Sequence, residues 1–225
     1  MDLDMKIVDD IIRISQKYKE IHKIVLFGSR ARGDNTAKSD VDLAIYTGKS
    51  EKSELAHFIL EMEDIKTLLK IDIVEVNENL SEKMVSNIEK DGVVLLDKMS
   101  DKRASFKNAL ARLNESILEY DQTKSSSVRD GAIQRFEFST ELAWKTAKEF
   151  LTDEGFVDLN SPKSVMRQAF ASGLIDHENH WVDLLNDRNR TSHIYKEELA
   201  DEIYNKIVTV YYGELMKLLQ RLETL

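Results

Sequence analysis

The chain has 225 residues, 42% of them hydrophobic and 32% charged, so it can bury one large core or two small ones and is not generally disordered. One proline and eight glycines are few, which favours helix over an all-β fold. No apolar run reaches the ~18 residues that a membrane span needs, and the first ten residues carry acid where a signal peptide carries base. The absence of cysteine excludes disulfides and thiolate chemistry, and we expect a cytoplasmic protein with no membrane partner.

The formal net charge is −9, from 41 acidic and 32 basic residues. This balance gives no global attraction to nucleic acid, so any contact with RNA requires a local cluster of cations. The acidic excess is compatible with carboxylates grouped around a divalent metal ion, and equally with an ordinary solvated acidic surface.

Short apolar runs alternate with helical patterns in residues 1–98. The expected elements, in chain order, are a helix over 5–18, strands over 21–27 and 41–46, a helix over 51–69, a strand over 71–76, a helix near 80–90 and a strand over 92–96. This succession predicts an N-terminal α/β or α+β domain built around a mixed sheet.

Strand signals disappear in residues 101–225, where long 3.6-residue periodicities take over. Gly155 is typical of a helix C-terminus, and Ser161 followed by Pro162 is typical of a helix start. We predict a C-terminal all-α bundle of four or five helices, so the whole chain is of the α+β class with one domain over 1–98 and another over 101–225.

A polar segment connects the first two strands. Gly28 allows the backbone to approach a phosphate closely, and a helix that starts at Ser29 would direct free N–H groups at a triphosphate. Asp40 and Asp42 lie two residues apart at the start of the second strand, so their side chains can share one face and a Mg²⁺ ion. Asp72, on a neighbouring strand, can face them.

Three carboxylates with one or two metal ions would neutralise a triphosphate, lower the pKa of an attacking hydroxyl and stabilise a pyrophosphate leaving group. Asp72 is the best candidate for helping to deprotonate the acceptor. Arg30, Arg32 and Lys38 are candidate phosphate contacts; alternatively, they are exposed cations that keep the loop soluble. Each feature alone is typical of a turn or a solvated strand edge, and only the combination indicates nucleotidyl transfer.

A second polar cluster interrupts the helical pattern near residue 190. A histidine can act as a general base or acid and an arginine can stabilise a pentacoordinate phosphate, so Arg188 and His193 suit metal-independent RNA cleavage through attack by the 2′-hydroxyl. Residues five apart on a continuous helix point about 140° apart, so we expect the helix to end near Thr191 or the site to be completed across a dimer. Composition alone favours Arg188 and His193 as helix caps or cross-links, and Tyr195 as an aromatic anchor.

The pattern Gly28-Ser29, ten residues, then Asp40-x-Asp42, with Arg-x-Arg-Gly inside it, resembles the minimal nucleotidyltransferases of the DNA polymerase β-like superfamily. The resemblance covers about residues 1–98. It implies nucleotidyl transfer from ATP or another nucleoside triphosphate, with Gly28 and Ser29 at the phosphates. It also implies that Asp40, Asp42 and Asp72 are the metal ligands, with Mg²⁺ as the cofactor.

The segment from Arg188 through His193 to Tyr195 resembles the R-x4-H-x-Y motif of the HEPN superfamily, in particular the small helical proteins encoded beside minimal nucleotidyltransferases. This resemblance covers about residues 101–225. Family members are RNase toxins with a catalytic arginine and histidine, and the nucleotidyltransferase antitoxin adds AMP to the tyrosine of the motif. The chain therefore resembles both partners fused into one polypeptide.

The leading hypothesis is a nucleotidyltransferase that transfers AMP from ATP to Tyr195 and so controls a HEPN ribonuclease site that takes RNA, with a homodimer formed through the bundle. The alternative is a small-molecule nucleotidyltransferase, similar to the aminoglycoside-modifying enzymes, in which the bundle binds the substrate. A third interpretation is an inactive bundle that mainly drives dimerisation.

Two further features carry weaker signals. His177 and His180 have a spacing found in metal sites, but the sequence offers no obvious further ligand, and an exposed turn is the simpler interpretation. Trp144 and Trp181 lie on helical patterns and are expected in the core or an interface rather than in base stacking.

Overall fold

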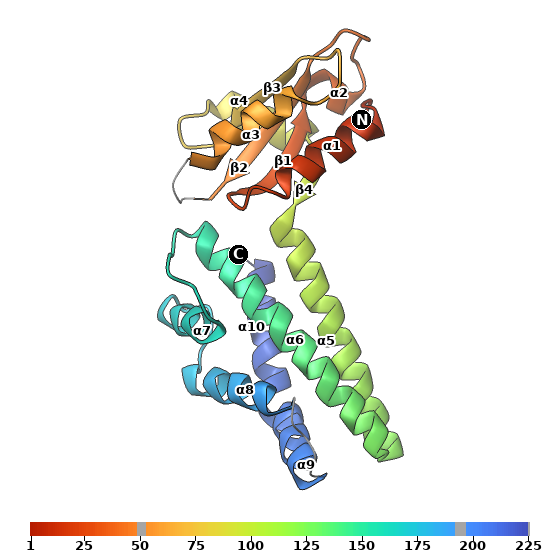
Figure 1. The fold of residues 1–225 in the computed structure, drawn as a ribbon, viewed down its shortest axis with the longest axis vertical. Helices are drawn as coiled ribbons and strands as arrows, with labels where there is room; N and C mark the ends of the chain where they lie inside the picture. Colours follow the sequence, from red (N-terminus) through yellow and green to blue (C-terminus); the bar gives the residue numbers. More distant parts are fainter. Residues whose placement is uncertain (49–52, 192–196, 225) are drawn as a thin grey trace. The chain divides into compact units, whose positions relative to one another are not determined.

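Figure 1 shows the computed structural model of the protein, which describes residues 1–48, 53–191 and 197–224. The chain divides into two compact units, Met1–Met99 and Ser100–Leu225. The predicted fold class, a mixed-sheet α/β unit followed by an all-α unit, is confirmed. No described helix has the length and apolar character needed to cross a membrane.

Helices and strands alternate through the described residues of the N-terminal unit. In chain order they are α1 (Met5–Ser15), β1 (Ile21–Phe27), α2 (Gly28–Arg32), β2 (Val41–Thr47), α3 (Ser53–Glu63), β3 (Ile71–Glu75), α4 (Glu82–Asp91) and β4 (Val93–Asp97). The sheet has the order β3-β2-β1-β4. Strand β1 pairs antiparallel with β2 and β4, whereas β2 and β3 are parallel, which confirms the predicted mixed sheet.

Helices cover both faces of this sheet, as Figure 1 shows for α3 and α4. Residues such as Ile24 and Leu26 of β1 pack in one cluster with apolar side chains of α1 and α3. The alternate residues Val25 and Phe27 pack in a second cluster with Ile88 of α4. The central strand is therefore buried on both faces, which explains why it reads as a continuous apolar run.

Two predicted helices are shorter than their apolar patterns indicate. Helix α1 ends at Ser15 rather than near residue 18, and α3 ends at Glu63 rather than at residue 69. After α3, short turns include a bond from the Ile65 amide to the Met62 carbonyl, and Ile65 still packs in the core. The chain needs these turns because it must reverse before β3 can pair in parallel with β2.

The described residues of the C-terminal unit are helical apart from their connections. The elements are α5 (Lys98–Thr123), α6 (Ser126–Asp153), α7 (Pro162–Ala171), α8 (Glu178–Thr191), α9 (Glu197–Lys206), the π-helical turn η1 (Ile207–Tyr211) and α10 (Tyr212–Thr224). Because α9, η1 and α10 follow one another without a break, this part of the chain agrees with the predicted bundle of four or five helices.

Helix α6 is central to this bundle, because it contacts α7, α8, α9 and α10. The core contains Phe136 of α6 together with the fully buried Phe106 of α5 and Trp181 of α8. The predicted helix signals operate as expected: Gly155 follows α6 with a φ of 91°, and Ser161 caps α7 with Pro162 in its first turn.

Candidate functional site

The turn from β1 into α2 brings the backbone directly against a carboxylate of β2. Gly28 has a φ of 73°, and a Cβ atom added to it would lie 2.2 Å from Oδ2 of Asp42. Only glycine combines this backbone conformation with such a close approach. From the sequence, Gly28 is expected to let the backbone approach a phosphate. In the structure, the group that the backbone approaches at Gly28 is the carboxylate of Asp42.

The parallel pairing of β2 and β3 places Asp42 and Asp72 in register as Cα partners. Asp40 is exposed and lies one residue before β2, so it is next to the strand rather than on it. The three predicted carboxylates therefore gather at one end of the sheet, beside the turn that contains Gly28.

The local environment raises the pKa of the Asp42 carboxyl group above its ordinary value of 3.8. Partial burial is the largest cause, followed by repulsion from the carboxylates of Asp72 and Asp40. The cations Arg32 and Lys70 act in the opposite direction and do not compensate. A group of carboxylates that is partly buried and short of positive charge is the donor set that a hard divalent cation prefers. These residues fit a divalent metal ion.

Asp72 is paired with Lys70, whose Nζ lies 2.7 Å from Oδ1 of Asp72. This pair borders a pocket of about 400 Å³ between α3 and β3, with an otherwise mainly apolar lining that includes Ile59 and Met62. A metal ion that binds Asp72 must therefore displace the ammonium group of Lys70. The adjoining pocket can admit an apolar or aromatic group.

The loop cations predicted to contact phosphate differ from one another. Arg30 is 6% exposed, and its Nε and Nη1 donate to the carbonyls of Ser39 and Asp2 at 2.9 and 3.1 Å. It therefore holds the loop in place and is not a free cation on the surface. Arg32 is exposed and its Nε contacts Asp34 at 3.1 Å, and Lys38 is exposed.

Asp42→Asn should raise the stability of the metal-free protein at pH 7 by less than about 1 kcal/mol, because it removes a carboxylate that the folded state holds with a raised pKa but that remains partly solvated. The folded state of the wild type loses stability as pH rises through this pKa. The difference between the two proteins should accordingly vanish below the ordinary value of 3.8. Thermal melts from pH 3 to 8 in chelator test this, and a less stable variant at pH 7 would contradict it.

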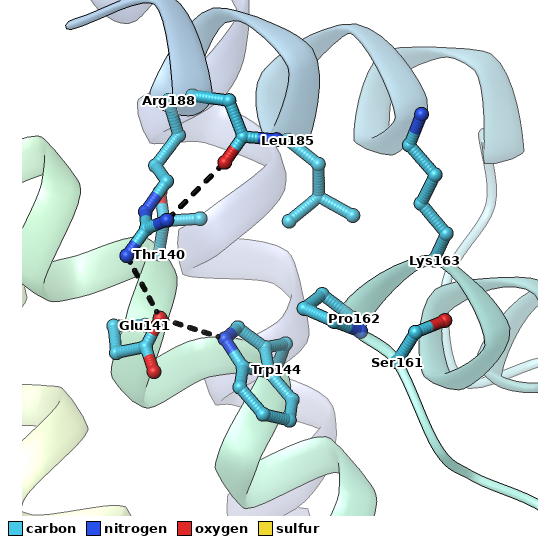
Figure 2. Close-up of a pocket in the computed structure, with 9 residues that line it drawn as sticks. Thr140, Glu141, Trp144, Ser161, Pro162, Lys163, Leu185 and Arg188 are labelled. Atoms are coloured by element: carbon cyan, nitrogen blue, oxygen red, sulfur yellow. Dashed lines mark hydrogen bonds and ion pairs between the residues drawn. The ribbon is translucent and has the colours of Figure 1, made fainter. Parts of the chain in front are cut away.

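In the helical unit, Arg188 of α8 lies at a pocket of about 220 Å³ between α6, α8 and the start of α7 (Figure 2). Nη2 of Arg188 lies 3.2 Å from Oε2 of Glu141, and the same oxygen accepts a bond of 3.0 Å from Nε1 of Trp144. Trp144 packs against the core, as expected, and it also lines this pocket together with Ser161.

The charge of Glu141 is well compensated. Partial burial would raise the pKa of this carboxyl, but hydrogen bonds from Lys145 and Trp144 and the charge of Arg188 lower it overall. Glu141 is therefore an anion at neutral pH. It holds Arg188 at the edge of the pocket while the guanidinium remains partly exposed.

A buried carboxylate fixes the end of α8 next to Arg188. Both oxygens of Asp187 are bonded: Oδ1 to Arg190 at 2.7 Å, and Oδ2 to Lys206 at 3.0 Å and to the hydroxyl of Tyr211 at 2.6 Å. Tyr211 belongs to the π-helical turn η1. Such turns often occur at functional sites, and this one brings a hydroxyl to the end of the helix that carries the motif.

Helix α8 is described as far as Thr191, and the predicted end of the helix near this residue stays a prediction. The hydroxyl of Thr191 donates to the carbonyl of Arg188 at 2.5 Å and also contacts Glu137. The predicted catalytic His193 and the predicted acceptor Tyr195 lie outside the residues that the structure describes.

Sequence reasoning missed Glu141 and Asp187. Glu141 is 47 residues from Arg188 in the chain, so no local pattern connects them. Asp187 did carry a signal: it is a charged residue at a position of α8 that the helical periodicity directs toward the core.

A nucleotidyltransferase-like α/β unit followed by a helical unit with an arginine-lined pocket defines a two-part class of protein. Residues 101–224 match the family model described as nucleotidyltransferase substrate binding protein like, and residues 9–101 match polymerase beta, nucleotidyltransferase. The first match spans more than half of the chain, so the protein belongs to that family. It joins a minimal nucleotidyltransferase domain to a HEPN-like domain, as the sequence motifs predict.

Each of two curated relatives matches part of the chain. Protein adenylyltransferase MntA of Aphanizomenon flos-aquae is 30% identical over 130 residues, covering 53% of this chain and 85% of MntA. Probable ribonuclease HepT of Haemophilus influenzae is 37% identical over 81 residues, covering 34% of this chain and 56% of HepT, so the chain spans little more than half of that relative's length.

Among solved structures, a protein from Haemophilus influenzae is described as revealing the fold of a substrate binding domain of a nucleotidyltransferase. It is 27% identical to this chain, with a TM-score of 0.50, and the match covers 54% of this chain and 98% of the other.

Proposed function

We propose that the N-terminal unit transfers AMP from ATP to a protein tyrosine, and that the acceptor is Tyr195 of the HEPN-like unit. The observation that carries this proposal is the Asp42 carboxylate, seated against Gly28 and grouped with Asp40 and Asp72. The relative MntA is named a protein adenylyltransferase, which supports a protein acceptor.

In the proposed reaction, the phenolic oxygen of the tyrosine attacks the α-phosphorus of ATP. A bond forms between that oxygen and phosphorus, the bond to the β-phosphate oxygen breaks, and pyrophosphate leaves. The carboxylate of Asp72 accepts the phenolic proton. The triphosphate is bound by Ser29, by the backbone after Gly28 and by the side chains of Arg32 and Lys38. Arg30 positions this loop through its bonds to the carbonyls of Ser39 and Asp2.

Mg²⁺ fits the three carboxylates of this site: Asp40, Asp42 and Asp72 would hold it. When bound, it neutralises charge on the triphosphate and on the leaving pyrophosphate. Without a cation, these carboxylates repel both one another and the polyphosphate.

Incubation of the unmodified protein with ATP and Mg²⁺ should add the mass of one or more AMP groups, located on Tyr195 by peptide mapping. Tyr195→Phe should abolish the gain because it removes the nucleophile. Asp42→Asn should slow the modification by about a hundredfold or more, because it removes a carboxylate that would hold the metal ion at the transferring phosphate. Intact-mass spectrometry is the measurement.

Tyr212→Phe is the matched control, because Tyr212 belongs to the helical unit and burial raises the pKa of its phenol, which makes it a poor nucleophile. It should be modified as the wild type is. A gain that persists unchanged in Tyr195→Phe would remove the proposed acceptor.

We propose for the HEPN-like unit an RNase activity that modification of Tyr195 silences. The relative HepT is named a probable ribonuclease, and Arg188 lies at the edge of an open pocket in this unit. The 2′-hydroxyl of RNA attacks the adjacent phosphorus, the bond to the 5′ oxygen breaks, and a 2′,3′-cyclic phosphate and a 5′-hydroxyl result. His193 transfers the protons and Arg188 stabilises the charged intermediate.

Cleavage is tested in the Asp42→Asn background, which slows modification of Tyr195, in the presence of a chelator and on protein whose intact mass shows no AMP. Arg188→Ala should reduce the rate by about a hundredfold or more, because it removes the cation that faces the developing charge. Arg13→Ala is the control, since Arg13 is an exposed arginine of α1 paired with Asp10. Equal cleavage by Arg188→Ala would contradict the proposal.

A small-molecule nucleotidyltransferase is the second candidate function. The pocket beside Arg188 and Trp144 favours it, as does the description of the solved relative as a substrate binding domain. Transfer to a diffusible alcohol or amine, unaffected by Tyr195→Phe, distinguishes this function from modification of the protein.

A homodimer through the bundle belongs to the same proposal. Phe138 on α6 and Leu118 on α5 are 59% and 56% exposed, so both offer apolar contacts to a second chain. Sedimentation velocity should give the mass of two chains, and Phe138→Lys should shift it toward one, because a charge at an apolar contact is costly. A single-chain mass for the wild type across the accessible concentration range would contradict the dimer.

A further inference from the structure

The histidine pair that the sequence leaves without a third ligand acquires one in the structure. His177 immediately precedes α8, His180 lies in the first turn of α8, and Glu214 of α10 reaches them from another helix. One nitrogen of each histidine and one oxygen of Glu214 lie within 4.8 Å of one another. The cluster is at the opposite end of α8 from Arg188.

The distances within this cluster fit a metal centre. Nδ1 of His177 and Nδ1 of His180 lie 3.2 and 3.3 Å from the same oxygen, Oε1 of Glu214. Around a four-coordinate zinc ion with ligands at about 2.0–2.1 Å, neighbouring ligand atoms are about 3.3 Å apart. The two histidines thus stand at the separation from Glu214 that two corners of a zinc tetrahedron have.

The burial of Glu214 and of one histidine nitrogen is the second observation. The side chain of Glu214 is only 6% exposed, although a carboxylate is costly to bury. Nδ1 of His180 is itself buried and, within the described part of the chain, makes no hydrogen bond of good geometry despite its closeness to Glu214. In the tautomer protonated at Nε2, this buried nitrogen offers its lone pair to a cation.

We propose that His177, His180 and Glu214 bind a late first-row divalent metal ion of the Zn²⁺ type. Two imidazoles and one carboxylate form a donor set found in zinc proteins, and imidazole distinguishes such ions from Mg²⁺. The fourth position belongs to water, because the two histidine side chains are 50% and 43% exposed. The bound ion ties the start of α8 to α10.

Lys217 competes with the metal ion for Glu214. Its Nζ lies 3.2 Å from Oε1 of Glu214, the oxygen that both histidines face. A dication at this oxygen must displace the ammonium group, so Lys217 weakens metal binding. Removing the ammonium group of Lys217 should therefore raise the affinity for metal, whereas removing a ligand should lower it.

The test uses the full chain without an affinity tag, in excess Mg²⁺ so that the carboxylates of the N-terminal unit are occupied. Zn²⁺ binding is measured against a competing chelator, together with metal analysis. The wild type should bind one Zn²⁺ at this site. His177→Gln should weaken binding by at least about tenfold, because losing a ligand costs no less than losing a group that merely orients one. Lys217→Met should strengthen binding several-fold.

His57→Gln is the matched control, because His57 is an exposed histidine of α3 in the other unit. It should leave the affinity unchanged. Circular dichroism of each variant verifies folding, and His177 is suitable for substitution because half of its side chain is already in water.

Substitution with Co²⁺ supplies a second readout, since a four-coordinate site gives intense visible absorption and a hexa-aqua ion does not. We expect that absorption in the wild type and its loss in His177→Gln. Equal Zn²⁺ affinity in the wild type and His177→Gln, or a Co²⁺ spectrum that the substitution leaves unchanged, would overturn the proposal.

Discussion

Gly28 has no side chain, and this allows the carboxylate of Asp42 to lie directly against the turn between β1 and α2. A Cβ atom there would be 2.2 Å from Oδ2 of Asp42, so any other residue at position 28 would displace either the turn or the carboxylate. The register of β2 and β3 then sets Asp72 beside Asp42, and Arg30 fixes the loop that returns to β2. The geometry of the nucleotidyltransferase unit thus depends on one close approach between backbone and carboxylate.

The carboxylates of Asp187 and Asp42 differ in how their surroundings compensate their charge. Asp187 is bonded to Arg190, Lys206 and Tyr211, and these partners lower its pKa although burial acts to raise it. The neighbours of Asp42 are mainly other carboxylates, and its pKa is raised. The partners of Asp187 make it a structural support of α8, whereas Asp42 lacks such partners, as expected of a carboxylate that takes a cation in the proposed function.

The parts of the fold predicted from sequence are those encoded locally. The strand over 21–27 is apolar throughout because helices cover both faces, and the start of α7 follows from Ser161 and Pro162. The candidate site divides in the same way, because Gly28 and the Asp40-x-Asp42 pattern are local. The partners of Arg188 and of the histidine pair, Glu141 and Glu214, are 47 and 37 residues away and come from other helices, so only packing reveals them. From the sequence, Arg30 is expected to be an exposed cation or a phosphate contact, because the sequence does not show which carbonyl groups a guanidinium binds in the folded chain.

The position of Arg188 depends on buried groups more than on its own ion pair. Its pair with Glu141 is 3.2 Å long with both side chains about one-third exposed, and such pairs contribute about 0–1 kcal/mol. The segment that carries Arg188 is held instead by Asp187, whose side chain is 4% exposed and binds the π-helical turn. In the proposed RNase function, an RNA phosphate would therefore replace Glu141 at the guanidinium at little energetic cost while α8 stays in place. A weak pair suits that function, because Glu141 orients the guanidinium and yet competes only weakly with a doubly hydrogen-bonded phosphate.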